Sequence, residues 1–266
     1  MNLRNISVFD ADACIMMGKP LSDGYSQMSE LVLYFDENYI HEMVYKEIKS
    51  TIQKNHLDYL IEQELVCVIN DSMILEFLVD AIKDEYIACN FFVASIRSNL
   101  LNMEGDDKEK LEQMYRQVIN NQYMNVRDLL IDLFNIENRI DSDTNCGEFK
   151  TSVLIECLNF LGLAEINFFV SNDKQARSLI VRKYEESINT ISPIATFVLF
   201  KETNSMNETR ARAYLNNIGK KGINERIKVI NSRGEFVTKN YLDIFNDIYD
   251  NNIDISVTID GYIKYN

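Results

Sequence analysis

Residues 5–12, Asn-Ile-Ser-Val-Phe-Asp-Ala-Asp, place a short apolar run directly before two closely spaced carboxylates. This run predicts a buried strand over residues 5–9 that ends at Asp10. Residues 166–173, Ile-Asn-Phe-Phe-Val-Ser-Asn-Asp, repeat the arrangement, with Asp173 just beyond a second predicted strand. Because sites in open α/β sheets form at the carboxyl ends of the strands, both segments point to a site at one edge of a sheet.

Strand and helix patterns alternate along the rest of the chain. We expect further strands over residues 65–69, 194–200, 226–230 and 253–259. We expect helices over residues 41–64, 73–101, 108–136, 147–161, 174–184, 207–217 and 241–249, and a helix or a helix–strand mixture over 26–35. This alternation predicts an α/β fold with a mainly parallel central sheet, and the helices between 73 and 136 read as an insertion on one side of it.

The length bounds the domain organisation. The chain has 266 residues and a mass of 31.0 kDa, which is enough for one large domain with an extension. We expect residues 1–200 to form one domain that carries a helical insertion at about 72–140. Residues 201–266 are expected to form a C-terminal extension, which either completes the same domain or makes a separate cap.

Composition and cysteine usage argue against several classes of protein. Hydrophobic residues make up 46% of the chain and charged residues 26%, which are ordinary values for a globular protein. No apolar run reaches the roughly 18 residues of a membrane span, and the first residues do not resemble a signal peptide, so we expect no membrane partner. The five cysteines form no Cys-x-x-Cys pair and lie near neither histidine, which disfavours a zinc site and favours reduced thiols in the cytoplasm.

The net charge of −14 is unevenly distributed. Residues 1–173 carry 13 Lys and Arg against 30 Asp and Glu, whereas residues 174–239 carry 13 against 6. A strongly acidic chain is a poor candidate for non-specific nucleic-acid binding. The basic stretch over residues 174–239 nevertheless keeps nucleic acid among the candidate partners.

Two further carboxylates join Asp10 and Asp173 as candidates. Glu47 flanks the apolar stripe of a predicted helix, and Glu148 begins another helix, where the dipole favours a negative charge. If the fold gathers the four side chains, their repulsion requires a cation, and oxygen-only ligation suits Mg²⁺ or Mn²⁺. Each residue taken alone also fits a plainer role, as a helix cap, a solvated helix residue or a first-turn acid.

The order of these residues resembles that of the PIN-domain nucleases. The matching segments are residues 8–15 (Val-Phe-Asp-Ala-Asp-Ala-Cys-Ile), 44–48 (Val-Tyr-Lys-Glu-Ile), 146–148 (Cys-Gly-Glu) and 170–177 (Val-Ser-Asn-Asp-Lys-Gln-Ala-Arg). Each motif is short, but all four occur in the family's order over about residues 5–185. Glu47 and Glu148 are 101 positions apart, a longer separation than in the compact members of the family, and the chain also continues beyond residue 200, past the usual core.

The resemblance implies a three-layer α/β/α fold and a metal-dependent endonuclease that cuts RNA, usually single-stranded, in preference to DNA. It implies that Asp10, Glu47, Glu148 and Asp173 form the catalytic, metal-holding set for Mg²⁺ or Mn²⁺, with Asp12 and Ser171 as supporting groups. It also favours a homodimer, and the departures from the family leave room for a protein partner. In such a site the metal activates water and stabilises charge on the phosphodiester.

The basic stretch supplies candidates for nucleic-acid contact. Positively charged side chains there could bind backbone phosphates, or they could simply be solvated helix residues that balance an acidic neighbour. The candidates are Arg177, Arg182, Lys183, Arg210, Arg212, Lys220 and Lys221.

Two other classes of function compete with the nuclease. Asp10 and Asp12 after a strand also fit the Asp-x-Asp pair of haloacid-dehalogenase-like phosphatases, which form an aspartyl-phosphate with Mg²⁺. That chemistry would leave Glu47 and Glu148 without a role. Alternatively, the chain is a non-catalytic scaffold whose helical insertion docks a protein partner, although the apolar residues of the insertion also fit core packing.

Overall fold

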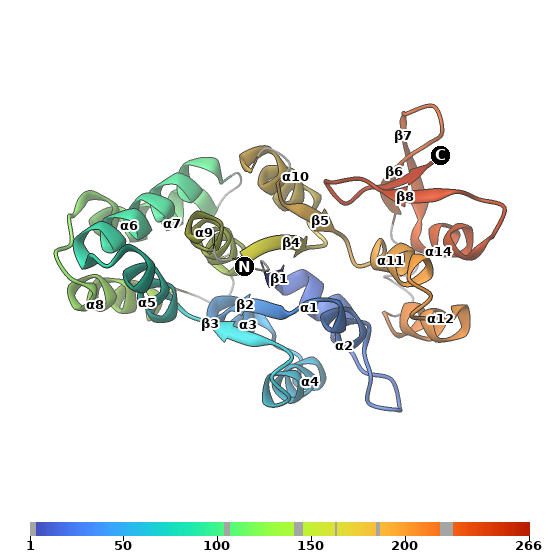
Figure 1. Ribbon diagram of the computed structural model, residues 1–266, viewed down its shortest axis with the longest axis horizontal. Coiled ribbons are helices and arrows are strands. Elements are labelled where there is room, and N and C mark those ends of the chain that lie inside the picture. The colour runs from blue at the N-terminus through green and yellow to red at the C-terminus, as the bar shows by residue number, and fades with distance from the viewer. Residues whose placement is uncertain (1–3, 104–106, 141–145, 163, 185–186, 219–225) are drawn as a thin grey trace.

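A sheet of five parallel strands occupies the middle of the molecule (Figure 1). The computed structural model describes residues 4–103, 107–140, 146–162, 164–184, 187–218 and 226–266. The strand order is β3-β2-β1-β4-β5, with β1 at the centre. The strands are β1 (Arg4–Phe9), β2 (Glu37–His41), β3 (Cys67–Ile69), β4 (Ala164–Val170) and β5 (Asn189–Ile191). The predicted α/β class with a parallel central sheet is therefore confirmed.

Helices cover both faces of this sheet, so the fold has three layers. Successive residues of β1 divide between two buried cores, because side chains alternate across a strand: Val8 packs with one and Phe9 with the other. The core around Val8 includes helices α9 (Cys146–Leu161) and α10 (Lys174–Lys183). The core around Phe9 includes α1 (Ala11–Met17), α2 (Gln27–Leu31), the 3₁₀ turn η1 (Val32–Tyr34) and α4 (Thr51–Glu62). The short helix α3 (Glu42–Glu47) contributes to both.

The two long helices expected over residues 73–101 and 108–136, which we refer to as the helical insertion, are each divided in two. The four helices are α5 (Asp71–Ile82), α6 (Glu85–Asn102), α7 (Asp107–Asn120) and α8 (Val126–Glu137). Lys83 adopts a left-handed conformation with φ 61°, and Asp84 then caps α6 by accepting from the Ile87 N–H. Asn125 caps α8 in the same way. The spacing of apolar residues alone predicts a continuous helix at both places. Single capping residues within the apolar pattern divide it into two helices.

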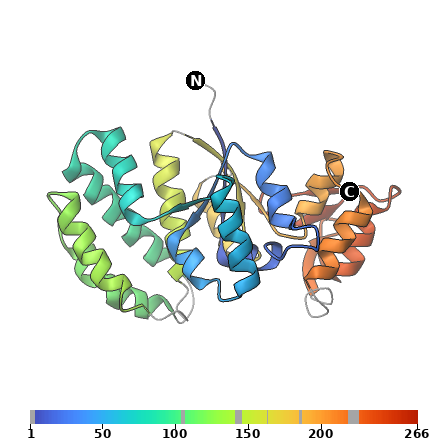
Figure 2. The same ribbon diagram turned by 90° about the horizontal axis from the view of Figure 1, so that it is seen from below.

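The chain beyond β5 builds a second, four-stranded sheet in the order β7-β6-β9-β8. Its strands are β6 (Arg226–Ile230), β7 (Phe236–Asn240), β8 (Ile255–Val257) and β9 (Ile263–Tyr265), and its helices are α11 (Thr196–Glu202), α12 (Glu208–Asn217) and α14 (Tyr241–Tyr249). Figures 1 and 2 show this part at one end of the molecule and the helical insertion at the other. The C-terminal residues therefore do not extend the parallel sheet.

Three expectations about elements were wrong. Residues 194–200 form most of α11 and not a strand, because a short apolar run fits a buried helix as well as a buried strand. The helix expected over 41–64 is broken between α3 and α4, where Ile48 has extended backbone angles. Strands β2 and β5 carry polar residues and are short, so no apolar run marked them. Within the described residues, every helix is too short or too polar to cross a bilayer.

Candidate active site

The acidic residues that follow the two central strands lie at one edge of the sheet. Strands β1 and β4 pair in parallel with Phe9 opposite Val170, so Asp10 and Ser171 come next at the same end. The Asp10 N–H continues the ladder by donating to the Val170 carbonyl over 3.1 Å. Asp10 is only 4% exposed and Ser171 is fully buried, so the sheet edge holds a carboxylate and a hydroxyl away from water.

Both aspartates also cap the helix that follows them. Asp10 Oδ1 accepts from the Ala13 N–H at 2.8 Å and caps α1. Asp173 Oδ1 accepts from the Gln175 N–H at 2.5 Å and from the Ala176 N–H, and caps α10. In each case these backbone bonds go to a single carboxylate oxygen. The capping bonds therefore do not use the second oxygen of either carboxylate, so each aspartate can cap its helix and also belong to a site.

A contact between distant parts of the sequence brings Glu47 and Glu148 to the same place. Glu47 is the last residue of α3, which follows β2, the neighbour of β1. The Gly147 N–H in the first turn of α9 donates to Glu47 Oε1 at 2.7 Å, and Glu148 is the next residue. A Cβ on Gly147 would lie 2.8 Å from the carboxyl carbon of Glu47, so this close approach requires glycine.

The carboxylates act on one another electrostatically. Burial, reinforced by the charges of three neighbouring carboxylates, raises the pKa of Glu148 to about 7. Those neighbours are Asp173, Asp12 and Glu47. Burial also raises the pKa of Glu47, which accepts the Gly147 hydrogen bond that opposes the shift, and Asp12 again adds to it.

Asp10 shows the same combination. Burial raises its pKa to about 7, against the opposing hydrogen bonds from the Ser171 hydroxyl and the Ala13 N–H, and the charges of Asp12 and Glu148 add to the rise. The pKa of Asp12 is itself raised, first by burial and then by Asp173. The four predicted acids and Asp12 thus form one interacting group, which we call the acidic cluster.

The donor chemistry of the acidic cluster fits a hard divalent cation. Every side chain in it offers carboxylate oxygens, which Mg²⁺ and Mn²⁺ prefer. The pKa values of Asp10 and Glu148 are raised mainly by burial, with a contribution from neighbouring carboxylates, so a bound cation would stabilise their charged forms. In the described part of the chain, no three His, Cys, Asp or Glu side chains already stand in a metal-holding arrangement. Cation binding would therefore require the carboxylates to draw together.

A cavity of about 260 Å³ opens beside the acidic cluster. Glu148 and Asp173 line its inner end. Its walls mix apolar side chains, among them Phe149 and Met103, with polar ones from α6 and α10 such as Asn102. Because α6 belongs to the helical insertion, the insertion supplies one wall of the approach to the cluster. We refer to this space as the insertion groove.

The three basic candidates on α10 lie in different surroundings. Arg177 is 5% exposed and donates from Nη1 to the Ser171 carbonyl at 2.7 Å and from Nε to the Asp260 carbonyl at 3.2 Å. It is therefore a buried structural group and not the surface residue that the sequence suggested. Lys183 pairs with Glu156 at 2.6 Å, whereas Arg182 lines the insertion groove.

The other basic candidates lie farther along the chain. Arg210 binds Asp23 and Glu30, and Arg212 binds Glu208 at 2.7 Å, so both guanidinium groups are engaged within the molecule. Lys220 and Lys221 lie outside the described residues.

One group near the site was missed in the sequence. Lys150 of α9 is completely buried, two residues beyond Glu148, and pairs with Asp71 of α5 and with Glu137 of α8. Asp71 also contacts His41 Nε2 at 3.1 Å. The sequence offered one signal of this group, a single lysine inside an otherwise apolar helical stretch. Such a lysine is expected to be buried, and a buried cation requires an acidic partner.

The structure thus gathers the predicted acids from four separate segments and leaves most of the predicted cations engaged elsewhere. Searches against protein-family models, curated proteins and solved structures found no match to this chain.

Proposed function

We propose that this protein is a metal-dependent nuclease that hydrolyses phosphodiester bonds, with single-stranded RNA as its substrate. The observation that carries the proposal is the acidic cluster, in which Asp10 and Glu148 both have a pKa of about 7 through burial and mutual repulsion. Perturbed carboxylates at the carboxyl ends of parallel strands mark a site where charge is held for a ligand and not for stability.

Asp10, Glu47, Glu148 and Asp173 would hold the cation. A bound Mg²⁺ or Mn²⁺ would supply Lewis-acid stabilisation of the charge that develops on the phosphodiester and would acidify a water. The order of these residues in the sequence, which resembles that of PIN-domain nucleases, agrees with this assignment.

Neighbouring groups orient the acids. The Ser171 hydroxyl donates to Asp10, and the Gly147 N–H fixes one oxygen of Glu47. The capping bonds of Asp10 and Asp173 hold their side chains against the starts of α1 and α10. With its raised pKa, Glu148 retains a proton near neutral pH until a positive charge approaches. The insertion groove is lined by two of the same acids, Glu148 and Asp173, and would admit part of the substrate.

Cleavage assays test the proposal directly. End-labelled single-stranded RNA and DNA are incubated with wild type, Asp10→Asn and Asp173→Asn, each with Mg²⁺, with Mn²⁺ or with EDTA. Asn retains the capping ability of Asp, so folding is preserved. We expect RNA cleavage by wild type that depends on the cation and falls about 100-fold or more in both variants, because several kcal/mol of charge stabilisation are lost.

The control is Asp80→Asn, which changes an exposed acid on α5 and is expected to leave cleavage unchanged. The proposal fails if wild type cuts neither nucleic acid with either cation, or if both site variants cut as fast as the control. Hydrolysis of p-nitrophenyl phosphate that depends on Asp10, without RNA cleavage, would instead favour the phosphatase alternative.

A further inference from the structure

A second cavity, of about 370 Å³, is lined by residues that follow strands of the parallel sheet, such as Asn172 and Ser192, and by residues of the second sheet. Lys174 and Arg177 of α10 line one side of it, and Arg226 and Lys228 of β6 line the other. Its described lining contains these four cations and no carboxylate. This is unusual in a chain with a net charge of −14, and we call the space the cationic cavity.

The cations on β6 are presented together on one face of the second sheet. Arg226 and Lys228 are two residues apart in a strand, so their side chains leave the same face of the sheet, and both are exposed. Within the described ranges, neither they nor Lys174 take part in an ion pair. Other cations of the C-terminal part do: Lys239, for example, pairs with Asp247 at 2.7 Å.

The fourth cation, Arg177, is fixed in place before any ligand arrives. Its two carbonyl partners come from Ser171, at the edge of the acidic cluster, and from Asp260, in the loop before β9. Gly261 allows this approach: its φ is 75°, and a Cβ there would lie 2.8 Å from Arg177 Nε. The second sheet is therefore locked against the parallel sheet through a buried guanidinium at the floor of the cationic cavity.

The cationic cavity is continuous with the site already described. Lys174 and Tyr262 line both this cavity and the insertion groove. Asn172, which lines the cationic cavity, immediately precedes Asp173, which lines the groove. A chain lying across Asp173 would thus have an acidic site beneath it and a cluster of positive charge to one side.

We propose that the cationic cavity binds a backbone phosphate of single-stranded RNA, next to the bond presented to the acidic cluster. The identity of the strand rests on the proposed function. The physical reason is electrostatic: a polyanion approaching a cluster of carboxylates is repelled, and cations just beyond the cluster supply the compensating attraction. Arginine and lysine are the side chains that bind phosphate oxygens most strongly.

RNA binding without cleavage tests this directly. A fluorescein-labelled oligouridylate is titrated with protein in EDTA, and its anisotropy is followed over a series of salt concentrations. The test variant is Arg226→Gln/Lys228→Gln. The matched control is Arg233→Gln/Lys264→Gln, which removes the same charge from the turn between β6 and β7 and from β9, outside the cavity. Thermal melts verify that both variants fold.

We expect the test variant to bind about 10-fold or more weakly at low salt, and the magnitude of its slope of log K against log salt to decrease by about 0.7, which corresponds to one lost phosphate contact on a single strand. The control is expected to keep the wild-type slope. Equal losses of RNA affinity in the two variants would overturn the proposal, because such losses would depend on net charge alone. Unchanged affinity in both variants would overturn it as well.

The outcome is separable from that of the proposed function. If wild type binds RNA through Arg226 and Lys228 but cuts nothing with Mg²⁺ or Mn²⁺, the phosphate site stands and the nuclease proposal fails. If cleavage depends on Asp10 while the test variant binds RNA like the control, the nuclease proposal stands and the cationic cavity is not a phosphate site.

Discussion

At the scale of single residues, Glu148 shows that a charged carboxylate in the acidic cluster lowers the stability of the fold. Its pKa of about 7 lies above its usual value of 4.5. Between these two values the folded protein binds a proton that the unfolded chain has released. The stability contributed by this group is therefore present at low pH and is lost as the pH rises toward 7 and beyond.

We predict that Glu148→Gln stabilises the metal-free protein at pH 8. Removing the charge relieves burial and repulsion, which we expect to raise the free energy of unfolding by about 1–3 kcal/mol. The gain should shrink toward zero by pH 5, where Glu148 is already protonated. Thermal melts in EDTA at the two pH values measure this. Glu76→Gln, on the exposed face of α5, is the control and should change neither melt.

Gly147 gives a second prediction at this scale. In Gly147→Ala the new methyl group meets the Glu47 carboxylate, which can rotate away, so the fold should lose less than about 1 kcal/mol. The displaced carboxylate should nevertheless lower RNA cleavage by up to about 100-fold. Cleavage and melting are compared with those of Asn159→Ala, an exposed position on the same helix. Equal activity of the two variants would contradict a role for the Glu47 position.

At the scale of elements, Lys150 joins the helical insertion to the sheet. It bridges α9 to α5 and α8, lies 5.2 Å from the centre of the Tyr115 ring of α7, and reaches β2 through Asp71 and His41. Burial alone would raise the pKa of Asp71, but the charges of Lys150 and His41 outweigh it and hold that pKa well below its usual range.

We predict that Lys150→Met destabilises the protein by about 3–5 kcal/mol, because it removes the buried cation that pairs with the Asp71 carboxylate. Asp71→Asn should have a similar effect, and the double variant should lose clearly less than the sum. Since the pKa of Asp71 is lowered, its stabilisation is present at neutral pH and disappears as the pH falls below about 4. Urea unfolding followed by tyrosine fluorescence measures each value, and simple additivity would contradict a coupled pair.

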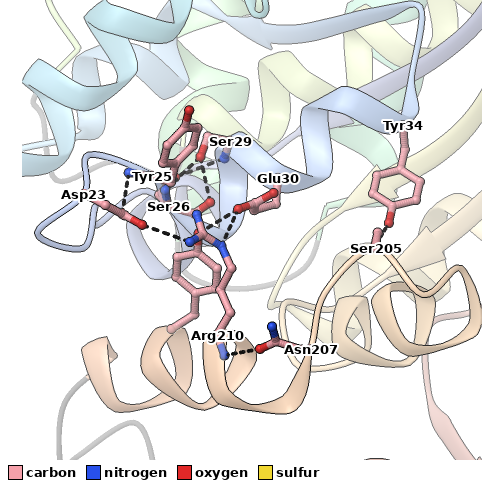
Figure 3. A network of polar contacts seen from close by, with 10 residues as sticks. Asp23, Tyr25, Ser26, Ser29, Glu30, Tyr34, Ser205, Asn207 and Arg210 are labelled. Carbon is pink, nitrogen blue, oxygen red and sulfur yellow. Dashed lines mark hydrogen bonds and ion pairs between the residues drawn. The ribbon is translucent and has the colours of Figure 1, made fainter.

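At the scale of the whole molecule, the C-terminal part is held to the parallel-sheet part by polar contacts as well as by apolar ones. Arg210 of α12 donates to Glu30 of α2 at 2.8 Å and to Asp23 at 2.9 Å, as Figure 3 shows. Its guanidinium also lies over the rings of Tyr25 and Tyr214. On the far side of the same junction, Thr190 N–H donates to the Ile259 carbonyl at 2.8 Å.

We predict that Arg210→Ala lowers the free energy of unfolding by about 1–2 kcal/mol, a value reduced from that of a buried pair because the group is partly exposed. Arg210→Lys should recover only part of this loss, since an ammonium cannot reproduce the two-pronged contact. Arg233→Ala, in an exposed turn, should be neutral. Full recovery by lysine would show that charge alone matters at this contact.

Local patterns in the sequence were enough for the fold class and for the positions of Asp10 and Asp173 just after two strands. An apolar run that ends in Asp marks a buried strand and its carboxyl end, and this holds for Asp10 and for Asp173 because strand burial and helix capping are local properties. The helical insertion was visible for the same reason. The helix breaks at Lys83 and at Asn125 were not visible in the sequence. A single residue ends the helix there, whereas the many residues around it favour a continuous helix.

Only the tertiary structure decided what these residues meet. Glu47 and Glu148 are about a hundred positions apart, and the Gly147–Glu47 hydrogen bond that brings them near each other depends on how α9 packs against α3. Arg177 and Arg210 look alike in the sequence, yet one is buried under the second sheet and the other binds two carboxylates. Long-range packing decides which cation is left free for a ligand. In a chain this acidic, a lysine or arginine forms an ion pair wherever the fold places a carboxylate near it.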